Sequence, residues 1–237
     1  MPNYSQLNPE LLVATVETLS ARVGERFPHA GLYKVSRHLC AVAAESRQRV
    51  NETGRRSIWI RISIGLLLLL LVAGIVATVL AFKIQPQPAS VTWLEFIQVV
   101  ESGINDMIFI GVAIFFLASL ENRMKRRRIL KALHELRSVA HVIDMHQLTK
   151  DPQRATGHLI ATPSSPANDL SPDQLIRYLD YCSEMLSLVG KLAALYLKRS
   201  DDAVVLSTVD EIEGLTTGLS RKIWQKLMII HAQKPGH

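Results

Sequence analysis

A cluster of histidine and acidic residues from His134 to His146 is the part of the sequence that most resembles a site for chemistry. In a helix, His141 and Asp144 share one face, and His134 lies two turns earlier. Imidazole and carboxylate groups bind zinc, so the candidate metal ligands are His134, His141, Asp144 and His146. The spacing is not HExxH, because Ser138 stands four residues after His134. A solvated helix face explains the same residues.

Three acidic residues lie near the start of the second apolar segment: Glu95, Glu101 and Asp106. Rings of carboxylates concentrate cations at the mouth of a channel when several subunits surround one axis. An outward-facing segment that avoids positive charge gives the same pattern. The inner half of the second apolar run also has no polar residue beyond Ser119. A cation-conducting oligomer with these acids at its outer mouth is therefore the alternative hypothesis.

Motifs for phosphate and acyl-transfer chemistry are absent from the sequence. The twelve glycines are scattered, without a P-loop, G-x-G-x-x-G or G-x-S-x-G arrangement. Cys40 and Cys182 form no CxxC pair. The net charge of +6 comes mostly from basic residues beside apolar segments, without interleaved aromatic residues. We expect no cofactor, no nucleic-acid partner and no enzymatic activity.

An uncharged run at residues 62–82, with six consecutive leucines, predicts a transmembrane helix. A run of about 21 residues covers about 31 Å at ~1.5 Å per residue, the thickness of a bilayer's hydrocarbon core. Small side chains along this segment would allow another helix, from this chain or a further copy, to pack closely. They are Ala73, Gly74, Ala77, Thr78 and Ala81.

A second apolar run at residues 107–120 predicts another span. Because about 14 residues are short for a bilayer, we extend the predicted span to about 104–120. Residues 91–103 before it are amphipathic and carry Trp93 on the apolar side, which predicts a separate helix in the outer membrane interface. A pore helix whose acidic side faces water is the alternative for this segment.

Basic residues mark one side of both predicted spans. The segment between the spans carries one lysine and three acids, so the positive-inside rule places both chain ends in the cytosol. We expect a multi-pass protein of the inner or plasma membrane. The basic residues at the membrane surface are Arg55, Arg56, Arg61, Arg123, Lys125, Arg126, Arg127 and Arg128.

Apolar residues at three- and four-residue spacing predict helices before and after the membrane segment. Residues 1–54 read as a helical hairpin interrupted at Pro28 and Gly31. The second span is expected to continue as a basic juxtamembrane helix through 121–147, and residues 148–171 are typical of a flexible linker.

The C-terminal residues 172–237 predict a second helical hairpin. Ser171 is a good N-cap, and Pro172 occupies the first helical position. The following heptads have two apolar faces, and the turn near Arg199 is short. This hairpin can pair with the N-terminal one to form a four-helix bundle.

The sequence thus predicts an all-α membrane protein with two transmembrane helices, in a membrane segment at 55–120, and a cytosolic bundle of N- and C-terminal helical hairpins. The leading hypothesis is a non-enzymatic, homo-oligomeric assembly or regulatory module in the lipid bilayer. Its helical faces would bind further copies or a cytosolic protein partner. A cation channel is the alternative, and a metal-dependent enzyme at the histidine cluster is the third hypothesis.

Overall fold

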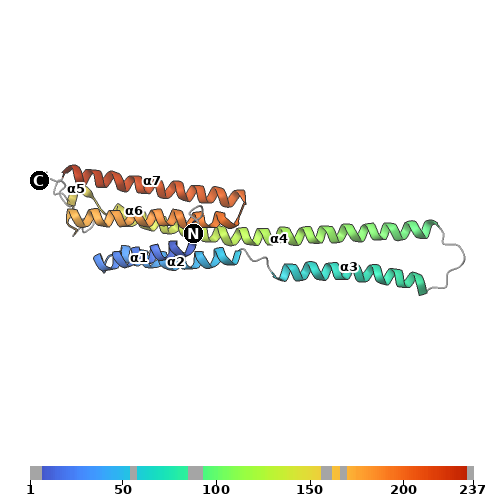
Figure 1. The fold of residues 1–237 in the computed structure, drawn as a ribbon. Coiled ribbons are helices and arrows are strands. Elements are labelled where there is room, and N and C mark those ends of the chain that lie inside the picture. Colours follow the sequence, from blue (N-terminus) through green and yellow to red (C-terminus); the bar gives the residue numbers. More distant parts are fainter. Residues whose placement is uncertain (1–6, 54–57, 85–92, 156–161, 166–169, 234–237) are drawn as a thin grey trace. The chain divides into compact units, whose positions relative to one another are not determined.

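The computed structural model describes residues 7–53, 58–84, 93–155, 162–165 and 170–233, and over these ranges the chain is helical without strands (Figure 1). The all-α prediction is confirmed. The helices are α1 (Pro9–Arg26), α2 (Gly31–Thr53), α3 (Ile58–Ile84), α4 (Trp93–Leu148), α5 (Pro152–Ala155), α6 (Pro172–Ala194), the 3-10 helix η1 (Leu195–Arg199) and α7 (Ala203–Gln233).

The chain divides into two compact units. One unit combines Met1–Gly54 with Arg128–His237, and the other is Arg55–Arg127. Helix α4 begins in the second unit and ends in the first. The first unit is therefore built from both ends of the chain.

Local capping explains where two of the bundle helices begin. The side chain of Asn8 accepts hydrogen bonds from the main-chain N–H groups of Glu10 (2.9 Å) and Leu11 (3.4 Å). Ser171 and Gln174 form a capping box, in which each side chain accepts a hydrogen bond from the other's main chain. In both helices a proline occupies the first turn, where its missing N–H costs nothing.

Two helical hairpins form most of the first unit. In the α1–α2 hairpin, the hydroxyls of Ser20 and Ser36 are 2.9 Å apart in the buried interface, which fixes the antiparallel register. In the α6–α7 hairpin, Gly190 allows close approach, because a Cβ there would lie 3.1 Å from Thr216 Oγ1. These are the hairpins that the apolar spacing predicted.

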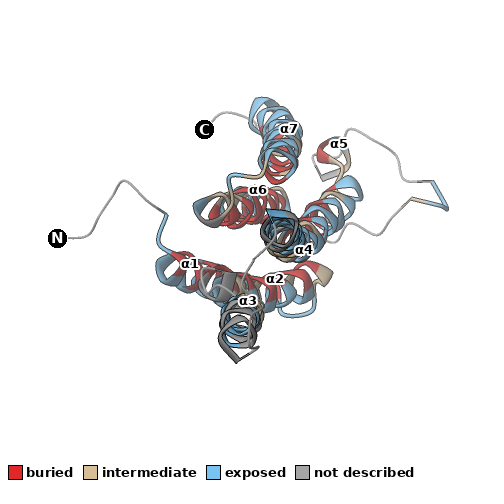
Figure 2. Cartoon of the chain, turned by 90° about the vertical axis from the view of Figure 1, so that its right-hand side faces the viewer, coloured by how far each residue is buried: buried red, intermediate tan, exposed pale blue. Residues whose placement is uncertain are grey.

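The end of α4 is a fifth helix in this bundle. Figure 2 shows it beside α6, with buried residues facing inwards from the surrounding helices. The sequence predicted a bundle made of the two hairpins, whereas the structure also buries an apolar stripe of this helix in the same core. An apolar stripe of this width must be buried against a partner. The buried residues of the stripe are Ile129, Ala132, Leu133, Leu136, Val139, Ala140 and Ile143.

Helix α4 is also a single element from Trp93 to Leu148. The sequence predicted a separate interfacial helix at 91–103 and a span starting near residue 104, and the structure corrects this division. No proline occurs between Trp93 and Leu148. The glycines at 103 and 111 each cost about 1 kcal/mol in a helix, which does not end it.

The predicted linker at 148–171 contains the short helix α5, in which Pro152 is buried. Residues 156–161 and 166–169 of this segment lie outside the described residues. The prediction of flexibility stays a prediction for them.

Of the described helices, α4 is long and apolar enough to cross a membrane, and none of its apolar window is buried by the rest of the chain. In α3 the described apolar stretch, Ile62–Gly74, is shorter than a span requires. The structure therefore supports one membrane-spanning helix by length and composition. That α3 is a second span stays a prediction.

Candidate functional site

The four candidate metal ligands lie on the bundle part of α4 but do not converge. His134 and His141 are exposed, whereas Asp144 and His146 are half-buried. The Asp144 carboxylate accepts a hydrogen bond from Gln147 Nε2 at 2.5 Å. Among the described residues, no group of three or more His, Cys, Asp or Glu side chains is arranged to hold a metal ion.

His146 instead has a packing role at the start of α2. A Cβ added to Gly31 would overlap the His146 ring, so the imidazole lies directly against this glycine. Burial lowers the pKa of His146, and the positive charge of Lys150 lowers it further. The neutral ring is therefore the form that fits the folded bundle.

Lys226 of α7 closes the C-terminal end of α4. Its ammonium donates hydrogen bonds to the main-chain oxygens of Gln147 (2.6 Å) and Lys150 (3.1 Å). The last carbonyls of a helix lack intrahelical partners, and a cation there also complements the helix dipole. Burial lowers the pKa of Lys226, while Asp151 and Asp144 oppose that shift. The arrangement stabilises a helix end.

Cys182 lies in the core close to this helix end. Its side chain is fully buried, and burial raises the pKa of the thiol to about 12, against the opposing effect of Lys226 and Lys150. A thiol with this pKa stays protonated at neutral pH, and only the thiolate is nucleophilic. Cys182 therefore acts as a small apolar core residue.

A second polar network joins α2, α4 and η1. The Arg49 guanidinium forms ion pairs with Glu45 on its own helix and with Glu135 of α4, the latter at 3.4 Å. The Tyr196 hydroxyl donates to Ser46 Oγ at 3.1 Å in the buried interior. Burial raises the pKa of Tyr196, while its hydrogen bonds with Ser46 and Arg49 oppose that shift. This network fixes the end of α2 to the bundle.

The acidic candidates for a pore mouth all belong to α4. Glu101 and Asp106 are exposed, and the side chain of Glu95 lies outside the described residues. Whether copies of the chain bring these acids together is a prediction that a single chain does not test.

The small-residue face of α3 is described only at its beginning. Ala73 and Gly74 are exposed, and a Cβ added to Gly74 would meet no atom within 4 Å among the described residues. The side chains of Ala77, Thr78 and Ala81 lie outside the described residues.

The structure describes the basic residues on α4 but not the side chains of those near the start of α3. Arg55, Arg56 and the side chain of Arg61 lie outside the described residues. On α4, Arg123 and Arg126 to Arg128 are exposed, whereas Lys125 is half-buried.

Glu121 is a polar residue that sequence reasoning missed. Its side chain is only 13% exposed and forms an ion pair with Lys125, with 2.7 Å between Lys125 Nζ and Glu121 Oε1. It lies one residue beyond the apolar run, four residues before Lys125. That i, i+4 spacing was the signal that could have identified the pair.

Comparisons with known proteins give no relative. No protein-family model matches the chain, and neither the curated proteins nor the solved structures give a match. The functional argument therefore depends on the chain's own geometry and chemistry.

Proposed function

We propose that this chain is a two-pass integral membrane protein whose cytosolic helical bundle serves as a non-enzymatic assembly or regulatory module. In this proposal α3 and the apolar part of α4 are the two spans. The arginines before α3 and the basic cluster on α4 lie on the cytosolic side, as the positive-inside rule expects.

The observation that carries this proposal is the exposure of the apolar part of α4. Phe109, Phe115 and Phe116 are 73%, 74% and 65% exposed, and none of the described residues buries this part of α4. Burial of one such side chain is worth about 1.5–3 kcal/mol, so three phenylalanines in water would be a large loss. A hydrocarbon environment removes this loss.

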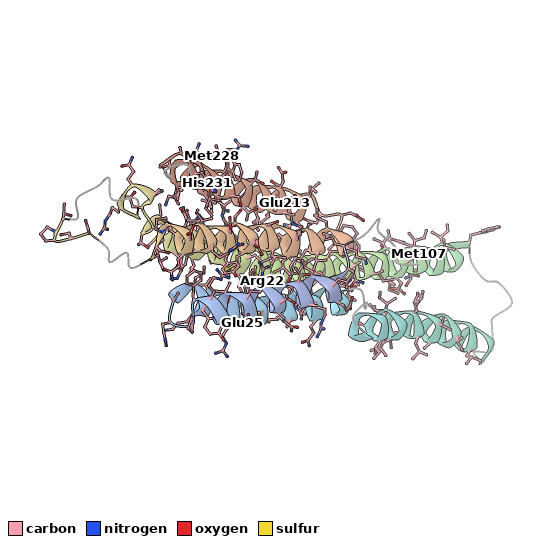
Figure 3. The ribbon with its side chains drawn as sticks, turned by 60° about the vertical axis from the view of Figure 1, so that its left-hand side comes forward. Arg22, Glu25, Met107, Glu213, Met228 and His231 are labelled. Carbon is pink, nitrogen blue, oxygen red and sulfur yellow. The ribbon has the colours of Figure 1, made fainter. Side chains whose placement is uncertain are left out.

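The bundle supports the second half of the proposal. Its conspicuous polar groups cap helices or join them, as Lys226 and Arg49 do. On its outer surface α7 exposes Trp224 (62%) and Met228 (54%), and Met228 projects away from the bundle in Figure 3. Neighbouring exposed apolar side chains of this kind mark protein interaction surfaces.

Membrane insertion and orientation are tested together by cysteine labelling in cells. Single cysteines are introduced in a Cys40→Ala/Cys182→Ala background, as Ser5→Cys near the N-terminus and Gln87→Cys between α3 and α4. We expect the protein to stay in the membrane after carbonate extraction. An impermeant maleimide should label Gln87→Cys in intact cells and Ser5→Cys only after lysis. Extraction by carbonate, or labelling of both positions in intact cells, would contradict the proposal.

Assembly is tested on the purified full chain in detergent. Light scattering coupled to size exclusion, and cross-linking in membranes, should both show more than one copy or a bound protein partner. Trp224→Ala should weaken that association, whereas Met145→Ala, an equally exposed position on α4, serves as the matched control. A strictly monomeric protein without cross-linked products would refute the assembly role.

A further inference from the structure

Helix α4 presents a continuous exposed face that changes from apolar to basic. Positions separated by three or four residues share one side of a helix. The exposed residues at this spacing are Phe109, Val112, Phe116, Leu120, Arg123 and Arg127. The same face is thus apolar over three turns and positively charged over the next two.

Another side of α4, over the same stretch of the helix, is half-buried instead of exposed. Ile110, Ile114 and Leu117 are half-buried, and the same side continues to Glu121 and Lys125. The Glu121 carboxylate balances the charge of Lys125 at 2.7 Å. One cation of the basic cluster is therefore neutralised within the chain.

Arg123 and Arg127 have no such balance. Both are exposed, and among the described residues neither forms an ion pair. Two guanidinium groups one helical turn apart, without an acidic neighbour, attract an anion that approaches from solvent or lipid. A topology signal requires only positive charge near a span, whereas this arrangement places the unbalanced charge on the exposed apolar face.

We propose that this face binds an anionic phospholipid of the cytosolic leaflet. The acyl chains would lie on Phe109, Val112, Phe116 and Leu120, and the phosphate would contact Arg123 and Arg127. This inference rests on the proposed function, because it requires that α4 crosses the bilayer.

The axial distances along α4 fit a lipid. At ~1.5 Å per residue, Arg123 lies about 4.5 Å and Arg127 about 10.5 Å beyond Leu120. The headgroup layer on each side of a bilayer is about 5–7 Å thick, so Arg123 lies within it. The long side chain of Arg127 can reach back towards it.

The test uses the purified full chain in mixed micelles, with bound lipid measured by native mass spectrometry. Phosphatidylglycerol is the anionic probe and phosphatidylcholine the zwitterionic reference. Each juxtamembrane basic residue contributes about a five-fold gain in affinity, so Arg123→Gln/Arg127→Gln should bind phosphatidylglycerol about 30-fold more weakly. Phosphatidylcholine binding should not change.

A second double variant separates a specific face from general attraction. Arg126→Gln/Arg128→Gln removes the same charge from other sides of the helix, on average about 3 Å further from Leu120, and we expect it to retain most of the phosphatidylglycerol binding. Equal losses in the two double variants would overturn the inference. Inorganic phosphate competing as well as the lipid would also overturn it, because the site would then recognise a free anion.

Carbonate extraction of the same variants distinguishes failure of this inference from failure of the proposed function. If the unmodified chain stays in the membrane while both double variants bind lipid equally, only the lipid site is wrong. If carbonate releases the unmodified chain, the membrane proposal itself fails.

Discussion

At the scale of single residues, several buried hydroxyl groups in this bundle are paired with partners from other helices. Tyr196 follows α6, whereas its hydrogen-bond acceptor Ser46 belongs to α2. Gln147 shows the exception, because its buried Oε1 has no hydrogen-bond partner among the described residues. A hydrogen bond of this kind adds little net stability to the folded state. Removing one partner is costly, because the other polar group then stays buried without a hydrogen bond.

Tyr196→Phe should therefore destabilise the bundle by about 1 kcal/mol, because the Ser46 hydroxyl loses its donor while still buried. Thermal unfolding in detergent measures the change. The double variant Ser46→Ala/Tyr196→Phe should lose little more than the single variant, since both partners are then removed. Fully additive losses would show that the hydroxyls do not interact.

His146 should make the stability of the bundle depend on pH. Its pKa is lowered in the folded state, so the unfolded chain binds a proton more readily. The neutral His146 ring makes its full contribution to stability above about pH 6.5, the pKa of histidine in an unfolded chain. This contribution is lost as the pH falls through the lower pKa that His146 has in the folded protein. We expect the melting temperature to fall over this range, and His146→Gln to reduce the fall. His134→Gln, at an exposed position on the same helix, is the matched control substitution.

At the scale of helices, small residues decide how closely elements approach. Within α1, a Cβ added to Gly24 would lie 2.6 Å from Tyr33 Cε2 of α2. On α7, a Cβ at Gly214 would meet no atom within 4 Å among the described residues. The same substitution in two helices should therefore have opposite effects.

Gly214→Ala should stabilise the protein by about 0.5–1 kcal/mol, because alanine is the better helix former. Gly24→Ala gains the same propensity but forces the Tyr33 ring to move, and such overpacking costs about 1–3 kcal/mol. Chemical denaturation of both variants measures the difference. A stabilised Gly24→Ala variant would show that α1 and α2 are not in close contact at this position.

At the scale of the whole molecule, one core joins segments that the second unit, Arg55–Arg127, separates in sequence. Leu12 of α1, Leu136 of α4 and Leu186 of α6 belong to the same cluster of buried residues. Neither hairpin can bury its apolar face without α4 and the other hairpin. The N- and C-terminal segments should therefore unfold together.

Leu136→Ala should cost about 2–5 kcal/mol, because this side chain is fully buried. Hydrogen exchange should show faster opening in α1–α2 and in α6–α7 alike. Leu206→Ala, at a site on α7 that is 56% exposed, should change the stability by no more than about 0.5 kcal/mol. Faster exchange confined to one hairpin would contradict a shared core.

The sequence alone determined the helices and the faces that they bury. Ser171 identified a helix start, and the apolar stripes on α1, α2, α6 and α7 are buried as their spacing predicted. These features depend on residues three or four positions apart, so local physics is sufficient for them. The apolar run of α4 could be recognised from the sequence for the same reason.

Only the tertiary structure decided which polar residues have partners. Sequence spacing selected His134, His141, Asp144 and His146 as ligands, but His146 lies against Gly31, more than a hundred positions away. The sequence did not indicate which groups Lys226 and Arg49 contact, because these partners include residues of other helices. Glu121 shows the opposite case, because its pairing with Lys125 four residues later follows from the spacing alone. Contacts between helices arise from packing, which periodicity along one helix does not encode.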